Sequence, residues 1–187
     1  MIPDRPSDPG PGGAASKAYD VAIIGAGVVG CAIARSFAIR GWSTLVVEKA
    51  ADILEGASKG NSALLHNGFD EPTESLERKM VQAGHQLYRR IHRRMNLPLV
   101  ETGALVVAWS EGEVAALDGI RNLALRNGIT GATTIDADEL AEREPHLSRA
   151  ARGALVVPGE AIIDPWSAPL KVEERTRGRP PLKRCAA

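Results

Sequence analysis

The sequence has few cysteines, few aromatic residues, no excess of charge of either sign and no long apolar run. Its 187 residues include two cysteines, Cys31 and Cys185, so we expect no disulfide framework and a reducing, cytoplasmic compartment. Aromatic residues make up 4%, which is too few for a surface that stacks single-stranded nucleic acid. Basic and acidic residues both number 23, so no overall field attracts nucleic acid. No apolar run is long enough to predict a membrane span.

The composition that remains is that of a globular protein with two polar ends. Hydrophobic residues make up 44% and charged residues 25%, enough for one domain, or one and a fragment of a second. Residues 1–18 contain four Pro and three Gly, which predicts a disordered arm. Residues 171–187 contain six basic and two acidic residues, and we expect a disordered basic tail over 170–187.

The first ordered segment predicts a βαβ unit. The apolar run Val21–Ile24 is typical of a buried parallel strand. A helix is expected from Gly27 to Arg40, closed by Gly41, and a second buried strand from Thr44 to Glu48. A strand, a glycine-rich turn, a helix and a strand within about 30 residues indicate an α/β, Rossmann-like domain.

A GxGxxG motif lies at the turn of this unit, at Gly25, Gly27 and Gly30. It follows a predicted strand and opens a predicted helix, which is the context that a dinucleotide-binding turn requires. Gly25 permits the tight turn, Gly27 lets the backbone approach a pyrophosphate, and Gly30 lets the helix pack on the strand. The N-terminus of the helix supplies N–H groups and partial positive charge to phosphates.

Glu48 ends the second strand, where a carboxylate can accept hydrogen bonds from the ribose hydroxyls of adenosine. Its charge disfavours a ribose 2′-phosphate, and therefore NADP. The alternative is a glycine-rich turn without a nucleotide, with Glu48 merely solvated. The spacing alone does not distinguish NAD from FAD.

The rest of the chain predicts alternating helices and strands. Thr73 is the expected N-cap of a long helix with one apolar face, which ends near Asn96. The later elements are two strands within Leu99–Trp109, a helix over Glu113–Asn127, a strand at Thr133–Ile135, a helix over Asp136–Glu144, and strands at Gly153–Val157 and Ala161–Ile163.

Two stretches carry a resemblance to a known family. They are DVAIIGAGVVGCAIARSFAIRGWSTLVVEK and, after it, GASKGNSALLHNGFD. Together they resemble the D-amino-acid-oxidase-type superfamily of FAD-dependent oxidoreductases, with most likeness to flavin-dependent glycerol-3-phosphate dehydrogenases and 2-hydroxyglutarate oxidases. The likeness covers about residues 20–169. The motif G-A-S-x-x-N-S followed by H-x-G is the more specific of the two.

The resemblance implies FAD as cofactor and a set of site residues. Gly25, Gly27, Val28 and Gly30 would hold the pyrophosphate, with Glu48 at the ribose and Lys49 beside the adenosine. Gly56, Ala57 and Ser58 would form a second loop near the pyrophosphate. Asn61 and Ser62 would lead toward the isoalloxazine, and His66 would approach that ring from the substrate side as a catalytic candidate. Without the resemblance, Ser58, Asn61 and Ser62 can equally be turn formers, and His66 a structural hydrogen-bonder.

The resemblance ends abruptly after IIDPWSAPL, which predicts a chain cut short relative to the family. We expect an FAD-binding portion over 19–96 and part of a mixed α+β substrate domain over 97–169. The predicted partners are a small-molecule substrate, an unassigned electron acceptor and a second chain that completes the fold, with no metal. A hydroxy acid, glycerol 3-phosphate or an amino acid all fit as substrate. An NAD-binding module and a non-catalytic interaction fragment stay open as alternatives.

Overall fold

A computed structural model describes residues 2–4 and 18–176, with side chains as far as Lys171. The chain divides into two compact units, one formed by residues 1–62 with 164–187 and the other by residues 63–163. This division differs from the predicted boundary near residue 96. The reason is that the long helix α2 (Leu76–Met95) is bonded to the second unit, where Gln82 donates to the Asn127 carbonyl at 2.8 Å.

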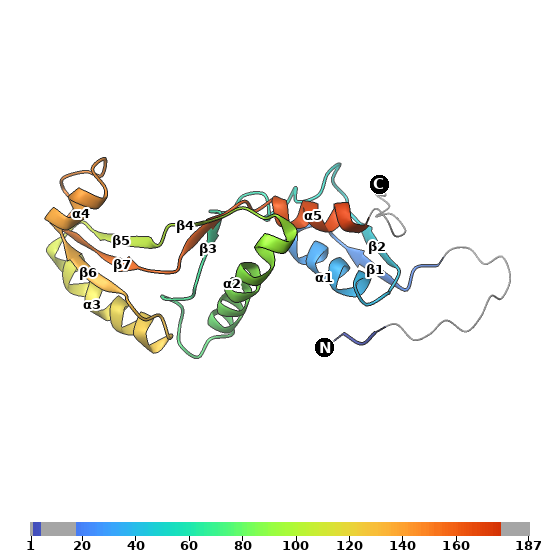
Figure 1. Cartoon of the computed structure of the whole chain (residues 1–187), viewed down its shortest axis with the longest axis horizontal. Helices are drawn as coiled ribbons and strands as arrows, with labels where there is room; N and C mark the ends of the chain where they lie inside the picture. The colour runs from blue at the N-terminus through green and yellow to red at the C-terminus, as the bar shows by residue number, and fades with distance from the viewer. Residues whose placement is uncertain (1, 5–17, 177–187) are drawn as a thin grey trace. The chain divides into compact units, whose positions relative to one another are not determined.

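The first unit contains the predicted βαβ arrangement (Figure 1). Strand β1 (Val21–Ile24) is followed by helix α1 (Val28–Ala38) and strand β2 (Thr44–Val47), and β1 and β2 pair in parallel. A small core of Ile23, Ala26, Ala34 and Val46 joins the helix to one side of the strands. The predicted βαβ unit is therefore confirmed.

Helix α5 (Ser167–Thr176) returns to the first unit and packs against α1. The sequence predicted disorder from residue 170, and that prediction is wrong for 170–176. Pro169 lies in the first turn of α5, where a missing N–H is tolerated. Asp164 secures that end of the helix, because its carboxylate accepts from Trp166 N at 3.0 Å and Ser167 Oγ at 2.5 Å. The rest of the predicted tail lies outside the described residues, as does most of the predicted arm.

The second unit begins with a small antiparallel sheet. Its order is β3 (Leu64–Leu65), β8 (Ala161–Ile163), β4 (Leu99–Glu101), and β3 was not predicted. Helix α2 starts two residues later than predicted, because the Ser75 hydroxyl, not Thr73, accepts from Arg78 N at 3.0 Å. Its predicted apolar face is largely exposed, with 71% of Leu76 and 59% of Met80 accessible.

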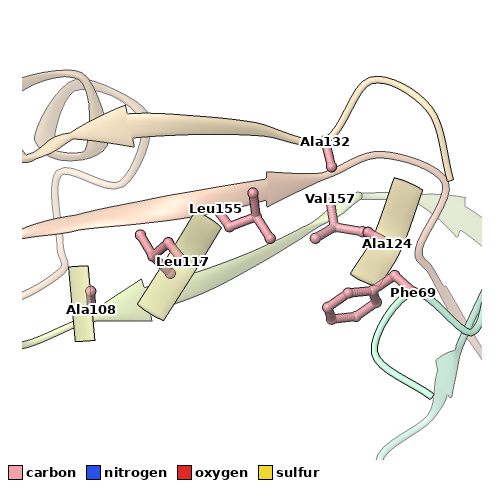
Figure 2. Close-up of a cluster of buried hydrophobic side chains, with 7 residues drawn as sticks. All are labelled: Phe69, Ala108, Leu117, Ala124, Ala132, Leu155 and Val157. Atoms are coloured by element: carbon pink, nitrogen blue, oxygen red, sulfur yellow. The ribbon is translucent and has the colours of Figure 1, made fainter. Parts of the chain in front are cut away.

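A second antiparallel sheet of the same unit holds most of its core. Its order is β5 (Ala104–Ala108), β7 (Gly153–Val157), β6 (Thr133–Asp136), and the helices are α3 (Glu111–Arg126) and α4 (Ala137–Arg143). Figure 2 shows Leu155 and Val157 of β7 gathered with Leu117 and Ala124 of α3. The alternate residue Ala154 packs with Leu140 of α4. Both faces of this sheet are therefore covered, as the period of two along a strand requires.

Among the described residues, no helix combines the length and the apolar character that crossing a membrane takes.

Candidate functional site

The glycine-rich turn between β1 and α1 has the geometry that its motif predicts. Gly25 has a φ of +100°, a region that L side chains rarely adopt, and its N–H donates to the Val47 carbonyl at 2.7 Å. A Cβ on Gly30 would lie 2.0 Å from the Gly25 carbonyl oxygen, so a side chain there would collide with the backbone. Glycine at both positions is thus what lets the turn form and the helix sit close to the strand.

The N-terminus of α1 is uncapped by its own residues. Gly27 is the N-cap, in extended conformation, and the first turn contains no acidic residue. The amides of this turn carry partial positive charge, and 67% of Val29 is exposed beside them. The end of α1 therefore has the features of an anion-binding helix terminus.

The loop after β2 lies against this helix end. The Ser58 hydroxyl accepts from Val28 N at 3.0 Å, and Leu54 N donates to the Ala26 carbonyl at 3.0 Å. A Cβ on Gly27 would lie 3.1 Å from Ser58 Oγ, which makes this contact tight. A hydroxyl that accepts one hydrogen bond still has its own proton to donate. Ser58 is therefore more than a turn former, because it joins the second predicted loop to the first.

Glu48 is held beside the same turn. Its Oε2 accepts from Ala26 N at 2.7 Å and its Oε1 from Ala50 N at 3.0 Å. The hydrogen bonds from Ala26 and Ala50, followed by the N–H and charge of Lys49, hold the pKa of Glu48 below its ordinary value against the opposing effect of desolvation. Glu48 is thus ionised at neutral pH, and each oxygen keeps a second lone pair for a ligand hydroxyl.

The remaining loop residues of the predicted set are exposed: Lys49, Ala57, Asn61 and Ser62. Asn61 Nδ2 donates to the Ser58 carbonyl at 3.0 Å, the local bond of a turn-forming residue. The first unit therefore gathers Gly25, Gly27, Val28, Gly30, Glu48 and Ser58 at one place.

His66 lies in the second unit, directly after β3. Its Nδ1 is 3.0 Å from Glu160 Oε2, and 49% of its side chain is exposed while only 1% of the Glu160 side chain is. Sequence reasoning missed Glu160. The available signal was a single acid within the apolar stretch GALVVPGEAII.

Two cavities are present, and the first includes Val28 of the predicted set in its lining. One, of about 320 Å³, is an apolar groove along α1 lined by Ile2, Val29 and Ile33 among others. The other, of about 410 Å³, is in the second unit between Gln82, His85 and Thr130. Within the residues that the structure describes, no cluster of three or more His, Cys, Asp or Glu side chains could hold a metal ion.

Known proteins match this chain over most of its length. It is 31% identical over 156 residues to a glycerol 3-phosphate dehydrogenase from Caloramator mitchellensis, covering 83% of this chain and 32% of that protein. It is 32% identical over 162 residues to a mitochondrial L-2-hydroxyglutarate dehydrogenase from Arabidopsis thaliana, covering 87% and 33%. The chain thus spans about a third of the length of the curated relatives it matches.

Solved structures share the fold. An L-alpha-glycerophosphate oxidase from Mycoplasma pneumoniae, with FAD bound, aligns at a TM-score of 0.82 and 24% identity, covering 90% of this chain and 44% of that one. A glycine oxidase from Geobacillus kaustophilus aligns at 0.77 and 24%, covering 90% and 46%. At these identities the likeness shows the fold alone.

The family match decides between the cofactors that the glycine motif left open. Residues 20–171 match the family described as DAO, FAD dependent oxidoreductase. The resemblance and the cofactor predicted from the sequence are confirmed, and an NAD-binding module unrelated to flavin is excluded. With its glycine-rich turn, its ionised acid at the end of β2 and this match, the chain belongs to the family of FAD dependent oxidoreductases.

Proposed function

We propose that the first unit binds the ADP half of FAD. The observation that carries the proposal is the convergence of the α1 terminus, whose first turn has no acidic residue, with Glu48, whose carboxylate is 2.7 Å from Ala26 N in the glycine-rich turn. A diphosphate at the helix end and a ribose at the acid match the charge and the hydrogen-bonding capacity of the two groups. The glycines fit this use, since Gly27 presents no side chain toward a ligand.

Each residue of the predicted set receives a role in this proposal. The pyrophosphate lies against the glycine-rich turn and the adenosine beside the end of β2, while the second loop leads from the pyrophosphate toward the isoalloxazine. The residues are Gly25, Gly27, Val28 and Gly30 for the pyrophosphate, Glu48 for the ribose, Lys49 for the adenosine, and Ala57, Ser58, Asn61 and Ser62 in the second loop.

We further propose that the complete enzyme is a dehydrogenase or oxidase of a small hydroxy acid, glycerol 3-phosphate or an amino acid. FAD, when bound, accepts a hydride from a carbon that bears a hydroxyl or amino group. His66 is the proposed catalytic residue, and its ring accepts the proton that leaves the hydroxyl or amine. Relatives named as dehydrogenases of glycerol 3-phosphate and L-2-hydroxyglutarate support this substrate range.

The wider setting is proposed from the sequence. We place the protein in the cytoplasm, a compartment that suits the buried thiol of Cys31. The proposed partners are the substrate, an electron acceptor of unassigned identity and a second chain that completes the fold. An exposed Ile24, with 92% of its surface accessible on the strand β1, gives such a chain an apolar surface to cover.

Flavin uptake by the 187-residue chain tests the proposal. The purified chain is mixed with FAD, desalted, and its visible spectrum is recorded. We expect retained flavin absorbance in the wild type and loss of that absorbance in Gly27→Trp, because an indole would fill the space for the pyrophosphate.

Gly119→Trp is the matched control, since it adds the same side chain in α3 of the second unit, where no neighbouring atom lies within 4 Å of a built Cβ. This control variant should retain flavin. A folded wild-type chain that takes up no FAD would contradict binding by the chain alone.

A further inference from the structure

Glu160 is a carboxylate in a place where carboxylates are rare. Only 1% of its surface is exposed, and it precedes strand β8 in an apolar stretch of the second unit. Burying a charged carboxylate is costly unless hydrogen bonds and an opposite charge compensate it. The contacts of the Glu160 carboxylate should therefore show which groups compensate its burial and what role it has.

The strand register brings Glu160 to His66. Leu64 pairs with Ile162 and Leu65 with Ala161, so one further antiparallel step sets His66 opposite Glu160. Directly opposed residues project on the same face of a sheet. The contact is observed, since His66 Nδ1 lies 3.0 Å from Glu160 Oε2.

The carboxylate is fixed from its other side. Glu160 Oε1 accepts from the backbone N–H of Asn67 at 2.6 Å, and the buried Asn67 side chain donates to the Pro158 carbonyl at 2.9 Å. Asn127 Nδ2 then donates to the Gly68 carbonyl at 3.0 Å and the Glu71 carbonyl at 2.7 Å. The backbone that follows His66 is thus held by the buried side chains of Glu160, Asn67 and Asn127.

The pairing determines where the ring keeps its proton. A carboxylate only accepts, so the His66 ring donates from Nδ1 and, when neutral, holds a lone pair on Nε2. About half of the ring side chain is exposed while its partner is buried.

We propose that Glu160 is the positioning residue for His66, holding the imidazole in the Nδ1–H tautomer so that Nε2 is the atom that accepts a substrate proton. In the reaction, the O–H or N–H bond of the substrate breaks and its proton passes to Nε2. The hydride of the adjacent carbon passes to FAD, the oxidant, and a carbon–oxygen or carbon–nitrogen double bond forms. The statement that the proton comes from a substrate rests on the proposed function. The coupling of Glu160 to His66 does not depend on it.

Ring nitrogen NMR of the full 187-residue chain tests this coupling without flavin or substrate. In the wild type, long-range ¹H–¹⁵N spectra of the neutral ring should show a protonated Nδ1 and a bare Nε2. In Glu160→Gln, the preference for the Nδ1–H tautomer should be lost, because a carboxamide has one acceptor oxygen and cannot accept from both the Asn67 N–H and the His66 ring.

Two controls distinguish a specific effect of Glu160 on His66 from a general effect of losing a carboxyl or of unfolding. Glu101→Gln removes a carboxyl of β4 that pairs with Arg89 at 2.6 Å, and His66 should keep its preference for the Nδ1–H tautomer. His92 of α2 serves as an internal reference in every variant. Backbone amide spectra establish that Glu160→Gln is folded.

Two results would overturn the proposal: an Nε2–H tautomer in the wild type, or an unchanged preference for the Nδ1–H tautomer in folded Glu160→Gln. The first requires no variant, so it decides the matter even if Glu160→Gln does not fold. A chain that binds FAD but lacks the coupling contradicts this proposal alone. A chain that shows the coupling but takes up no FAD contradicts only the proposed function.

Discussion

The two units cover their sheets differently. The sheet β5-β7-β6 has side chains of α3 packed on one face and side chains of α4 on the other, and Leu155 at its centre is fully buried. The parallel pair β1-β2 is packed by α1 through Ile23 and Val46, but 92% of Ile24 is exposed. Parallel strands are normally buried on both faces. The sheet β5-β7-β6 is thus covered on both faces, whereas the β1-β2 pair leaves Ile24 exposed.

We expect the largest effect from shortening a buried side chain of the sheet β5-β7-β6. Leu155→Ala removes a side chain with no exposed surface and leaves a cavity, which should lower the free energy of unfolding of the second unit by about 2–5 kcal/mol. Native-state hydrogen exchange, read separately for amides of β7 and β1, measures it. A loss of equal size in β1 would show that the two units unfold as one.

A smaller effect is expected at the cap of α2. Ser75→Ala removes the hydroxyl that accepts from Arg78 N, which should cost about 1 kcal/mol in the stability of the second unit. Denaturant unfolding followed by circular dichroism measures it. Ser75→Asp, which supplies another capping oxygen, should restore most of the loss, and failure to do so would show that capping is not the cause.

A pH-dependent effect is expected in the first unit. Because the pKa of Glu48 is lowered on folding, its contribution is present above the ordinary carboxyl pKa and is lost as pH falls through the lowered value. Protection of the β1 amides from exchange, after correction for the intrinsic exchange rate, should therefore fall at acid pH, and the effect should be small because the Glu48 side chain is reached by solvent. Glu48→Gln should remove that pH dependence. An unaltered profile in this variant would assign the effect to other carboxyls.

The smallest effect is expected at Ile24. Replacing this exposed side chain by threonine in Ile24→Thr should change stability by no more than about 0.5 kcal/mol, in contrast to Leu155→Ala. The measurement is the same exchange experiment at β1. A loss of several kcal/mol would mean that the second face of β1-β2 is covered in solution.

Local signals predicted most of the elements and the nucleotide turn. The GxGxxG spacing located β1, α1 and the roles of Gly25 and Gly30, because each role depends on backbone geometry within a few residues. The same signals could not predict which strands are covered on both faces, because VAII of β1 and GALVV of β7 are both apolar runs typical of buried strands.

The features that could not be predicted from the sequence depend on contacts between residues far apart in the chain. Strand β3 has only two residues and forms by pairing with β8, nearly a hundred positions away. The partner of His66 is equally remote in sequence, so the lone acid in GALVVPGEAII could be noticed locally but its pairing with His66 could not be predicted. The catalytic role of His66 and the roles of the exposed loop residues stay predictions.

The order of the chain has a consequence for how the protein is made. The first unit is discontinuous, because the chain leaves it after Ser62 and returns only at Asp164 to build α5 against α1. During synthesis, the whole second unit leaves the ribosome before α5 does. The continuous second unit can therefore fold as soon as its last strand leaves the ribosome, while α1 waits for its late partner. A ribosome stalled just after residue 163 has left its exit tunnel would carry a folded second unit within an incompletely folded first unit.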